Sequence, residues 1–168
     1  MFQIIAVAAI AALVAADQIT KSLFAAYVAE KGATEFLFGL FRLTYVKNTG
    51  AAFSSFSDNT LLLTVFTVVL VAGCFGYLLL SKKLNTFLRI CLILIVAGGV
   101  GNLIDRIANG FVVDFIEPLF MNFAVFNFAD ICITVGAFAL LFYEVFSMFR
   151  SEKTKTKTVS EGTKKTDE

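Results

Sequence analysis

The chain has 168 residues, of which 58% are hydrophobic and only 16% are charged. A soluble domain is closer to half apolar and a quarter charged, and here the apolar residues fall in long uncharged runs, which is typical of a membrane protein. The net charge of +1 gives no general positive field that would attract nucleic acid, so we expect no nucleic-acid partner.

Four stretches are apolar and long enough to cross a bilayer, which takes about 20 residues. They are residues 4–24, 61–80, 84–104 and 131–149. The first could pass for a signal peptide, but it lacks a basic N-terminal region and three further spans follow, so we expect an uncleaved helix. The three cysteines, Cys74, Cys91 and Cys132, lie in apolar runs, and we expect buried thiols instead of disulfides or a metal site.

Basic residues are concentrated on one side of these spans. Three flank the loop between the second and third spans and six follow the fourth, which makes nine of the 14 Lys and Arg: Lys82, Lys83, Arg89, Arg150, Lys153, Lys155, Lys157, Lys164 and Lys165. The positive-inside rule places these segments, and therefore both termini, in the cytoplasm. We expect an integral membrane domain over 1–150 and, because 151–168 has no apolar face, a disordered cytoplasmic tail.

Residues 25–60 and 105–130 are then extracytoplasmic. In the first of these segments, TEFLFGLFRLTYVKNTGAAFSSFS (34–57) shows short apolar alternation before an Asn-Thr-Gly turn signal. We expect a strand pair or small sheet at the membrane surface, with its phenylalanines in the interface. The predicted fold class is an all-α membrane protein, a four-transmembrane-helix bundle with a small extracytoplasmic β-rich segment after the first helix.

Polar residues of several segments meet at the outer membrane level in this topology. Ionisable residues near a bilayer are costly and usually functional, so their convergence predicts a site. They are Asp17, Lys21, Asn48, Asn102, Arg106, Asp114, Asn127 and Asp130.

Structural explanations remain open for most of these residues. Asp17 and Lys21 have the i, i+4 spacing of a helical ion pair, and Arg106 could pair with its neighbour Asp105. An N-cap with an acidic residue in the first turn would explain Asn127 and Asp130. Asp114 lies in Val-Val-Asp-Phe-Ile, where neither a cap nor an i+4 cation accounts for it.

The sequence contains no histidine, which excludes serine triads, histidine-activated cysteines and HExxH zinc sites, and we expect neither a metal nor a cofactor. A Ser–Lys dyad would need adjacent helical residues, which do not face each other. Two carboxylates brought close together share one proton, so one can activate water while the other donates a proton. Asp114 and Asp130 are the candidates for such an aspartic dyad.

Five motifs of the chain resemble the sequence blocks of the lipoprotein signal peptidase family, also called signal peptidase II. They occur in the family's order: DQITK (17–21), VKNTGAAFS (46–54), GGVGNLIDR (98–106), GFVVDFI (110–116) and FNFADICI (126–133). The resemblance implies an endopeptidase of the bacterial cytoplasmic membrane that removes the signal peptide from diacylglyceryl-modified prolipoproteins, just before the lipid-bearing cysteine. It further implies lipid contacts and inhibition by the cyclic peptide globomycin.

The resemblance also implies roles for single residues. The family's catalytic aspartates match Asp114 and Asp130, and its surrounding polar residues match Asn48, Asn102, Arg106 and Asn127, which we expect to contact substrate. Supporting roles fall to Asp17, Lys21, Gly50, Gly98 and Gly101, and the last two glycines would permit close approach of helices or substrate.

Three other classes of protein fit less well. A proton-coupled transporter also uses intramembrane acids, but it would place them near mid-membrane and usually shows internal repeats. A GxGD-type intramembrane protease needs an aspartate where this chain has Asn102. A non-catalytic membrane scaffold would have no use for Asp114.

Overall fold

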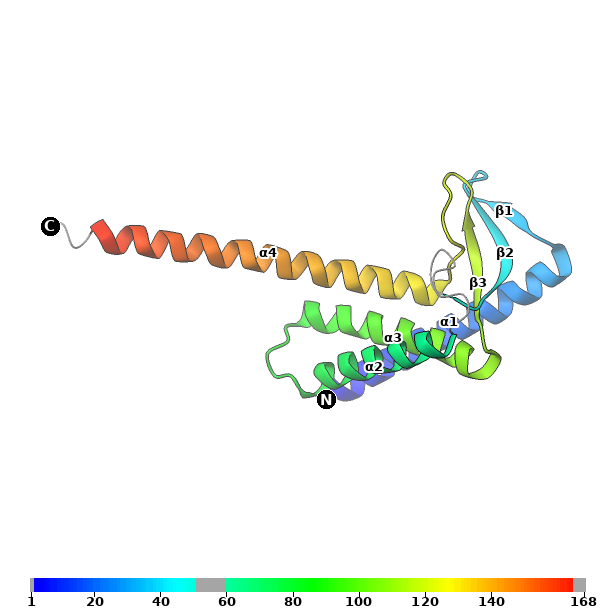
Figure 1. Ribbon diagram of the computed structural model, residues 1–168, viewed down its shortest axis with the longest axis horizontal. Helices are drawn as coiled ribbons and strands as arrows, with labels where there is room; N and C mark the ends of the chain where they lie inside the picture. The colour runs from blue at the N-terminus through cyan, green and yellow to red at the C-terminus, as the bar shows by residue number, and fades with distance from the viewer. Residues whose placement is uncertain (1, 51–59, 165–168) are drawn as a thin grey trace.

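The computed structural model describes residues 2–50 and 60–164, with side chains as far as residue 150. These residues form four helices, α1 (Phe2–Lys31), α2 (Thr60–Leu80), α3 (Thr86–Asn109) and α4 (Phe128–Lys164), and one small sheet (Figure 1). The sheet stands across one end of the helices, while the first turn of α1 and the last turn of α4 lie toward the opposite end. The predicted fold class is confirmed.

Each of the four helices contains a stretch long and apolar enough to span a membrane, in agreement with the predicted spans. The helices extend beyond those spans, above all α1, which continues to Lys31, and α4, which continues to Lys164. Helix α4 includes residues 151–164, and the disordered cytoplasmic tail over 151–168 stays a prediction.

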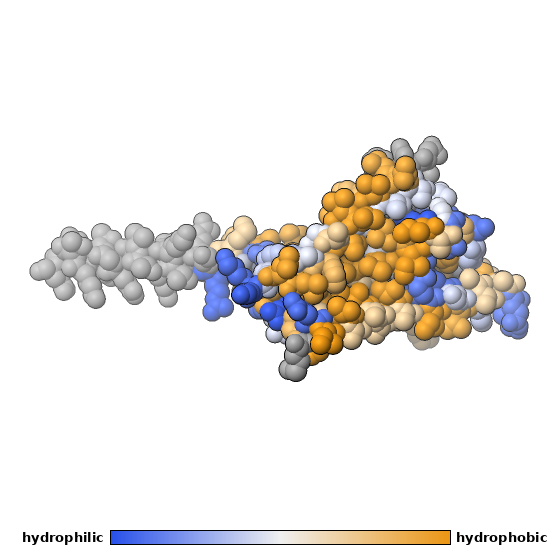
Figure 2. Space-filling view, turned by 90° about the horizontal axis from the view of Figure 1, so that it is seen from below, coloured by the Kyte–Doolittle hydropathy of each residue, from blue (hydrophilic) through white to orange (hydrophobic). Residues whose placement is uncertain are grey.

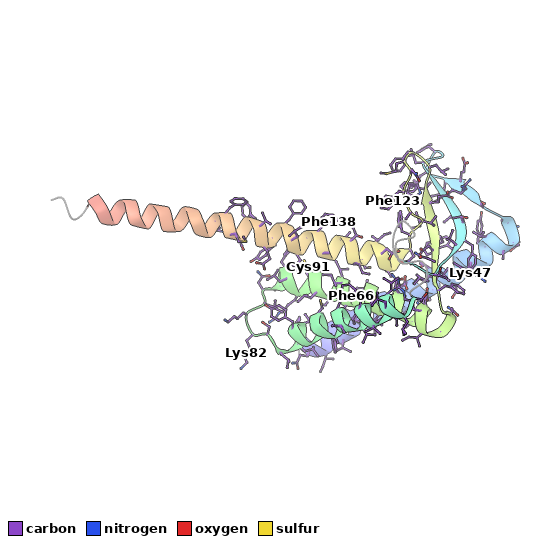
Figure 3. All side chains as sticks on the ribbon, in the orientation of Figure 1. Lys47, Phe66, Lys82, Cys91, Phe123 and Phe138 are labelled. Atoms are coloured by element: carbon purple, nitrogen blue, oxygen red, sulfur yellow. The ribbon has the colours of Figure 1, made fainter. Side chains whose placement is uncertain are left out.

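Helix α3 lies at the centre of the bundle and packs against α1, α2 and α4. Its buried face includes Leu92, Val96 and Ala97, whereas the other three spans keep most of their apolar side chains on the outside. Phe66 of α2 and Phe138 of α4 illustrate this outward orientation, with exposed fractions of 60% and 57% (Figure 3). Figure 2 shows the resulting apolar surface, with hydrophilic residues toward both ends of the helical part.

Local signals in the sequence set both ends of α3. The Asn85 side chain accepts a hydrogen bond from the backbone N–H of Leu88 at 2.9 Å, which is an N-cap contact. Gly110 adopts the left-handed conformation, with φ of 77°, and its N–H bonds back to the carbonyl of Arg106. The chain therefore leaves α3 in the direction of the sheet.

The sheet has three antiparallel strands in the order β1 (Thr34–Phe36), β2 (Phe41–Asn48) and β3 (Val112–Pro118). The β1–β2 hairpin is the strand pair that the sequence predicts between the first two spans. The third strand comes from the segment between α3 and α4, where no strand was expected. Its pairing with β2 places Asp114 opposite Val46, after an irregularity in the register between Leu43 and Val46.

Candidate active site

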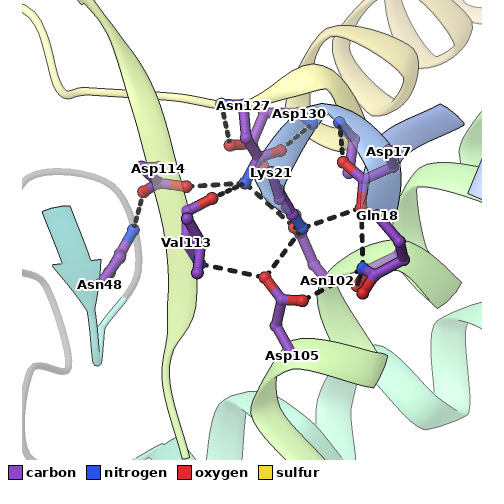
Figure 4. A network of polar contacts seen from close by, with 12 residues as sticks. Asp17, Gln18, Lys21, Asn48, Asn102, Asp105, Val113, Asp114, Asn127 and Asp130 are labelled. Carbon is purple, nitrogen blue, oxygen red and sulfur yellow. Dashed lines mark hydrogen bonds and ion pairs between the residues drawn. The ribbon is translucent and has the colours of Figure 1, made fainter. Parts of the chain in front are cut away.

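A buried network of polar side chains lies where the sheet meets the ends of the helices (Figure 4). Its centre is Asn127, the residue that precedes α4, together with Asp114 on β3 and Asp130 in the first turn of α4. Asn127 and Asp114 have exposed fractions of 0% and 1%. Two acidic side chains from separate elements therefore converge, one of them buried (Asp114) and the other partly exposed (Asp130).

Asn127 contacts both aspartates. Its side-chain amide donates to Oδ1 of Asp114 at 2.6 Å, and its backbone N–H donates to Oδ2 of Asp130 at 3.1 Å. The backbone N–H of Asp130 in turn donates to Oδ1 of Asn127 at 2.9 Å. This reciprocal pair is a capping box, so Asn127 caps α4 as the sequence suggests and also joins the two acids.

Two further asparagines complete the surroundings of the acids. Asn48, at the end of β2, donates to Oδ2 of Asp114 at 2.8 Å, and Asn102 of α3 donates to Oδ1 of Asp130 at 2.8 Å. The N–H of Gly50 donates to Oδ1 of Asn48, which leaves the amide NH₂ group of that asparagine directed at Asp114. Each carboxylate thus accepts two hydrogen bonds from neutral donors.

Beside the two acids, Lys21 is almost fully buried, with an exposed fraction of 3%. Its ammonium lies 2.9 Å from Oδ2 of Asp17 and 3.0 Å from Oδ2 of Asp105, and it donates to Oδ1 of Asn102 at 2.9 Å. The ion pair suggested by the i, i+4 spacing of Asp17 and Lys21 is present. The suggested pairing of Asp105 with Arg106 is not found, because the Asp105 carboxylate faces Lys21.

The two acids that pair with Lys21 also hold backbone segments of the site. Asp17 accepts the N–H of Ala129 in the first turn of α4 at 2.9 Å. Asp105 accepts the N–H of Val113, the residue before Asp114, at 3.0 Å. The ion cluster therefore ties α1 and α3 to the two segments that carry the candidate acids.

Gln18 also belongs to this network, although it is not among the site residues predicted from the sequence. Its amide lies within 3.1 Å of the carbonyl of Gly101 and of Oδ1 of Asp105, and within 3.2 Å of Oδ2 of Asp17. A neutral amide inside an apolar span beside an acid is itself an unusual feature. That feature is the signal in the sequence that could have identified Gln18.

Two glycines of α3 permit the close packing on which the network depends. A Cβ atom on Gly98 would lie 2.3 Å from the carbonyl oxygen of Ala129, and one on Gly101 would lie 2.5 Å from Oδ2 of Asp17. Real side-chain atoms do not approach so closely. Only glycine at these positions lets α3 touch the start of α4 and the polar face of α1.

The position of Asp114 changes its acidity. Burial, and after it the charge of Asp130, raises the pKa of Asp114 from 3.8 to about 6. The hydrogen bonds from Asn48 and Asn127 and the charge of Lys21 act in the opposite direction. A carboxyl group with such a pKa can both hold and release a proton near neutral pH.

A cavity of about 560 Å³ opens beside the network. Asn48, Asn102 and Asp130 contribute to its polar side, and the rest of its wall comes mainly from α2, α4 and residues 123–126. Arg106 also lines it, and the Nε atom of this arginine is buried without a hydrogen-bond partner among the described residues. Among the residues that the structure describes, no group of three or more His, Cys, Asp or Glu side chains could hold a metal ion.

Comparisons with known proteins identify relatives of this arrangement. The family model described as signal peptidase (SPase) II matches residues 9–146. Proteins named lipoprotein signal peptidase from two strains of Streptococcus pyogenes are each 40% identical over 129 residues, which is 77% of this chain and 85% of each relative.

Solved structures show the same architecture. One bacterial membrane enzyme obtained by the in meso method at 2.3 Å resolution has a TM-score of 0.74 and 25% identity, over 85% of this chain and 88% of that one. A second, at 1.9 Å resolution, has a TM-score of 0.69 and 26% identity, over 82% and 90%.

Proposed function

The chain belongs to the signal peptidase II family, a family of membrane proteases, and we propose that Asp114 and Asp130 are its catalytic dyad. In this proposal the protein is an aspartic endopeptidase that removes the signal peptide from diacylglyceryl-modified prolipoproteins, just before the lipid-bearing cysteine. The observation that carries the proposal is the position of Asn127. This one residue donates hydrogen bonds to both carboxylates, at 2.6 Å and 3.1 Å, and so holds the two acids around one point.

The surroundings suggest a division of labour between the two acids. Asp130 lies in the first turn of α4, where the helix dipole and a backbone N–H stabilise the negative charge of its carboxylate, and this charge is one of the causes that raise the pKa of Asp114. Asp114 lies on a strand without a helix dipole, and its raised pKa favours the protonated form. Asp130 is therefore the base that takes a proton from water, and Asp114 is the acid.

The reaction needs no covalent intermediate. As the water oxygen bonds to the scissile carbonyl carbon, Asp130 takes the water proton and Asp114 gives its own proton to the carbonyl oxygen. The resulting tetrahedral diol then passes one hydroxyl proton back to Asp114 while Asp130 returns its proton to the leaving nitrogen. The carbon–nitrogen bond breaks, and the dyad again holds one proton.

The cavity is the seat for the part of the substrate next to the scissile bond. Asn48, Asn102 and Asp130 lie on its polar side, whereas Leu63, Ile131 and the other apolar residues of its wall suit a signal helix or acyl chains. Arg106 lines the cavity and would bind a substrate carbonyl or lipid headgroup through its guanidinium group, whose buried Nε atom has no hydrogen-bond partner among the described residues. Globomycin would inhibit by occupying the same space.

We further propose that both termini are cytoplasmic and that the site opens at the extracytoplasmic face of the bacterial membrane. Lys82 and Lys83 lie in the short connection between α2 and α3, at the end of the bundle away from the sheet (Figure 3). The positive-inside rule assigns that end to the cytoplasm. The sheet, the cavity and the two acids are then at the other face, where a secreted precursor arrives.

A cleavage assay tests the dyad. Purified protein should cleave a diacylglyceryl-modified precursor peptide, whereas the variants Asp114→Asn and Asp130→Asn should each show no cleavage above background. The matched control is Glu117→Gln, which removes a carboxylate from the same strand as Asp114, where it pairs with Arg42 at a partly exposed site. Full activity in either aspartate variant would contradict the assignment.

A further inference from the structure

Two hydroxyl groups in the wall of the cavity have no part in the reaction described above. They belong to Thr67 of α2 and Thr134 of α4, two helices that both pack on α3. Apart from the two asparagines, the arginine and the aspartate already described, these are the only side chains of the wall, among the described residues, that carry a hydrogen-bonding group. Their neighbours in the wall, Leu63, Ile131 and Val135, are apolar. A hydroxyl in such surroundings needs a hydrogen-bond partner.

The two hydroxyls differ in what they can still bind. Thr67 donates to the carbonyl of Leu63, one turn earlier on α2, at 2.7 Å. Its single proton is thereby used, and its Oγ1 atom can only accept a further hydrogen bond. Thr134 makes no such bond to its own helix, and its hydroxyl has no hydrogen-bond partner within the described part of the chain. The wall thus offers an acceptor on α2 and a donor on α4.

Both hydroxyls lie farther along their spanning helices than the two acids. Thr134 comes one turn after Asp130, which is about 6 Å along α4. Thr67 comes two turns after Thr60, the first residue of α2, which is about 10 Å along that helix. Thr60 donates to the carbonyl of Thr49 at 2.8 Å, so α2 starts level with the end of β2, which borders the two acids. An extended chain advances about 3.3–3.6 Å per residue, and the hydroxyls are therefore two to three residues away from the acids.

A signal peptide has main-chain groups at this depth that lose their partners. Its helix satisfies its own backbone in the bilayer, but the scissile peptide bond must leave the helix before water can reach its carbonyl carbon. Every N–H and C=O group released in this way needs a new partner, because the hydrocarbon region offers none. The N–H and C=O of one trans peptide group point in opposite directions. An acceptor on α2 and a donor on α4 match these two groups.

We propose that Thr67 and Thr134 bind the main chain of the signal peptide where it unwinds, two to three residues before the scissile bond. Thr67 accepts a hydrogen bond from a peptide N–H, and Thr134 donates one to a peptide carbonyl. The ligand is the unwound backbone and not a particular side chain, so these contacts fix the register of the scissile bond in precursors of different sequence. The inference rests on the proposed function, because it takes the cavity to be the seat of a signal peptide.

Peptide binding tests the inference separately from cleavage. The full chain carries Asp114→Asn, for which the proposed function allows no turnover, and the dissociation constant of a fluorescent diacylglyceryl-modified precursor peptide is measured by anisotropy in lipid nanodiscs. Into this background Thr67→Val and Thr134→Val are introduced, which remove one hydroxyl each and keep the shape of the side chain. Serine at the same positions restores the hydroxyl. Thr64→Val is the matched control, because Thr64 is on α2, donates to the carbonyl of Thr60 at 2.7 Å and does not line the cavity.

We expect each of the valine variants at 67 and 134 to weaken peptide binding about 10-fold, because a main-chain group of the peptide is left without a partner. The serine variants and Thr64→Val should bind like the background protein. Two further peptides carry an ester in place of the second or the third peptide bond before the scissile bond, which removes one N–H. One of them should bind more weakly to the background protein, and Thr67→Val should then add no further loss.

Unchanged binding by both valine variants would overturn the inference, and so would the absence of any peptide binding by the background protein. A loss that serine does not restore, or that Thr64→Val shares, would also overturn it, because it would indicate a change in packing. Failure of the proposed function has a different signature, which is cleavage of the peptide by the Asp114→Asn protein. A difference in binding between the valine and serine variants would support the threonine contacts even then.

Discussion

The backbone N–H of Val113 donates a hydrogen bond of 3.0 Å to the carboxylate of Asp105. Val113 is the residue before Asp114, so this contact fixes the strand that carries one of the two candidate catalytic acids. The Asp105 carboxylate is itself held by the ammonium of Lys21 and the amide of Gln18, both from α1. The position of Asp114 therefore depends on a contact between α1 and α3 that lies outside the dyad.

Replacing Asp105 by Asn should lower kcat and leave KM nearly unchanged. The side chain of Asn has one acceptor oxygen, which cannot serve Val113, Gln18 and Lys21 together, and its NH₂ group would face one of these donors. An unsatisfied buried donor costs about 1–3 kcal/mol, which corresponds to a loss of about 10- to 100-fold if it is expressed in the transition state. Steady-state cleavage kinetics on the lipidated peptide measure both constants. A raised KM with unchanged kcat would instead place Asp105 in substrate binding.

Replacing Lys21 by Met should strongly destabilise the protein. Asp17 and Asp105 would be left as buried negative charges without a counter-ion, and breaking a buried ion pair in this way costs about 3–5 kcal/mol. Denaturant titration in detergent, followed with a thiol-reactive dye that reports exposure of Cys91 and Cys132, measures the change.

Lys31→Met is the matched control for Lys21→Met. Lys31 is also on α1 and also pairs with an acid, Glu30, but both side chains are more than half exposed. Exposed pairs of this kind contribute little, so the control should unfold like the parent protein. Equal stability of the Lys21 and Lys31 variants would show that the buried cluster is not a source of stability.

The raised pKa of Asp114 predicts how stability changes with pH. Below pH 3.8 the group is protonated in the folded and the unfolded state, and between 3.8 and about 6 only the folded state keeps the proton. Its stabilising contribution is therefore complete at low pH and is lost as the pH rises through about 6. The shift of about two pH units corresponds to about 3 kcal/mol.

Asp114→Asn should remove this pH dependence, because an amide does not titrate. Between about pH 4 and about pH 8 the parent protein should lose about 3 kcal/mol more free energy of unfolding than the variant does. Unfolding curves at several pH values give the change of the free energy of unfolding with pH for each protein. If this change were the same in the parent protein and the variant, the pKa of Asp114 would not be raised in the folded protein.

Features that depend on nearby residues could be predicted from the sequence, whereas features that depend on contacts between distant segments could not. The spans and the convergence of the polar residues at one end of them could be predicted, because hydropathy and the position of each polar residue along a span are properties of the chain itself. Strand β3 could not be predicted, because its partner β2 lies more than 60 residues earlier in the chain. Asp114 is part of a sheet only because β3 pairs with β2, where it lies opposite Val46.

The same limit applies to single side chains. Asp105 was considered as a partner of its neighbour Arg106, whereas its partners Lys21 and Gln18 are more than 80 residues away. The resemblance to a family indicated candidate residues of the site, but not the contacts that orient them. Those contacts depend on how α1, α3 and α4 pack.

Arg106→Ala should raise KM for the lipidated peptide and lower kcat/KM by about 10- to 100-fold. This loss corresponds to the free energy of one hydrogen bond to a charged group. Arg89→Ala is the matched control, since Arg89 is also on α3 and also has a buried Nε without a partner in the described part of the chain. Arg89, however, lies over the ring of Phe2, away from the cavity. Unchanged cleavage by the Arg106 variant would remove this residue from substrate binding.

Gly98→Ala should disrupt the packing of α3 against the start of α4. The added methyl group would lie 2.3 Å from the carbonyl oxygen of Ala129, and a backbone atom cannot move aside as the end of a flexible side chain can. The helices must separate, at a cost of about 1–3 kcal/mol or more. Because Asp130 follows Ala129 directly, cleavage should fall together with stability.

Gly76→Ala distinguishes this steric effect from a general effect of glycine in a helix. Gly76 lies on α2, and a Cβ atom there would meet no heavy atom within 4 Å. Alanine is also the better helix former by about 1 kcal/mol, so this variant should be as stable as the parent protein or more stable. Thermal unfolding and cleavage rates of the two variants test the difference. If Gly98→Ala behaved like Gly76→Ala, the close contact of α3 with Ala129 would not be needed to hold Asp130 in place.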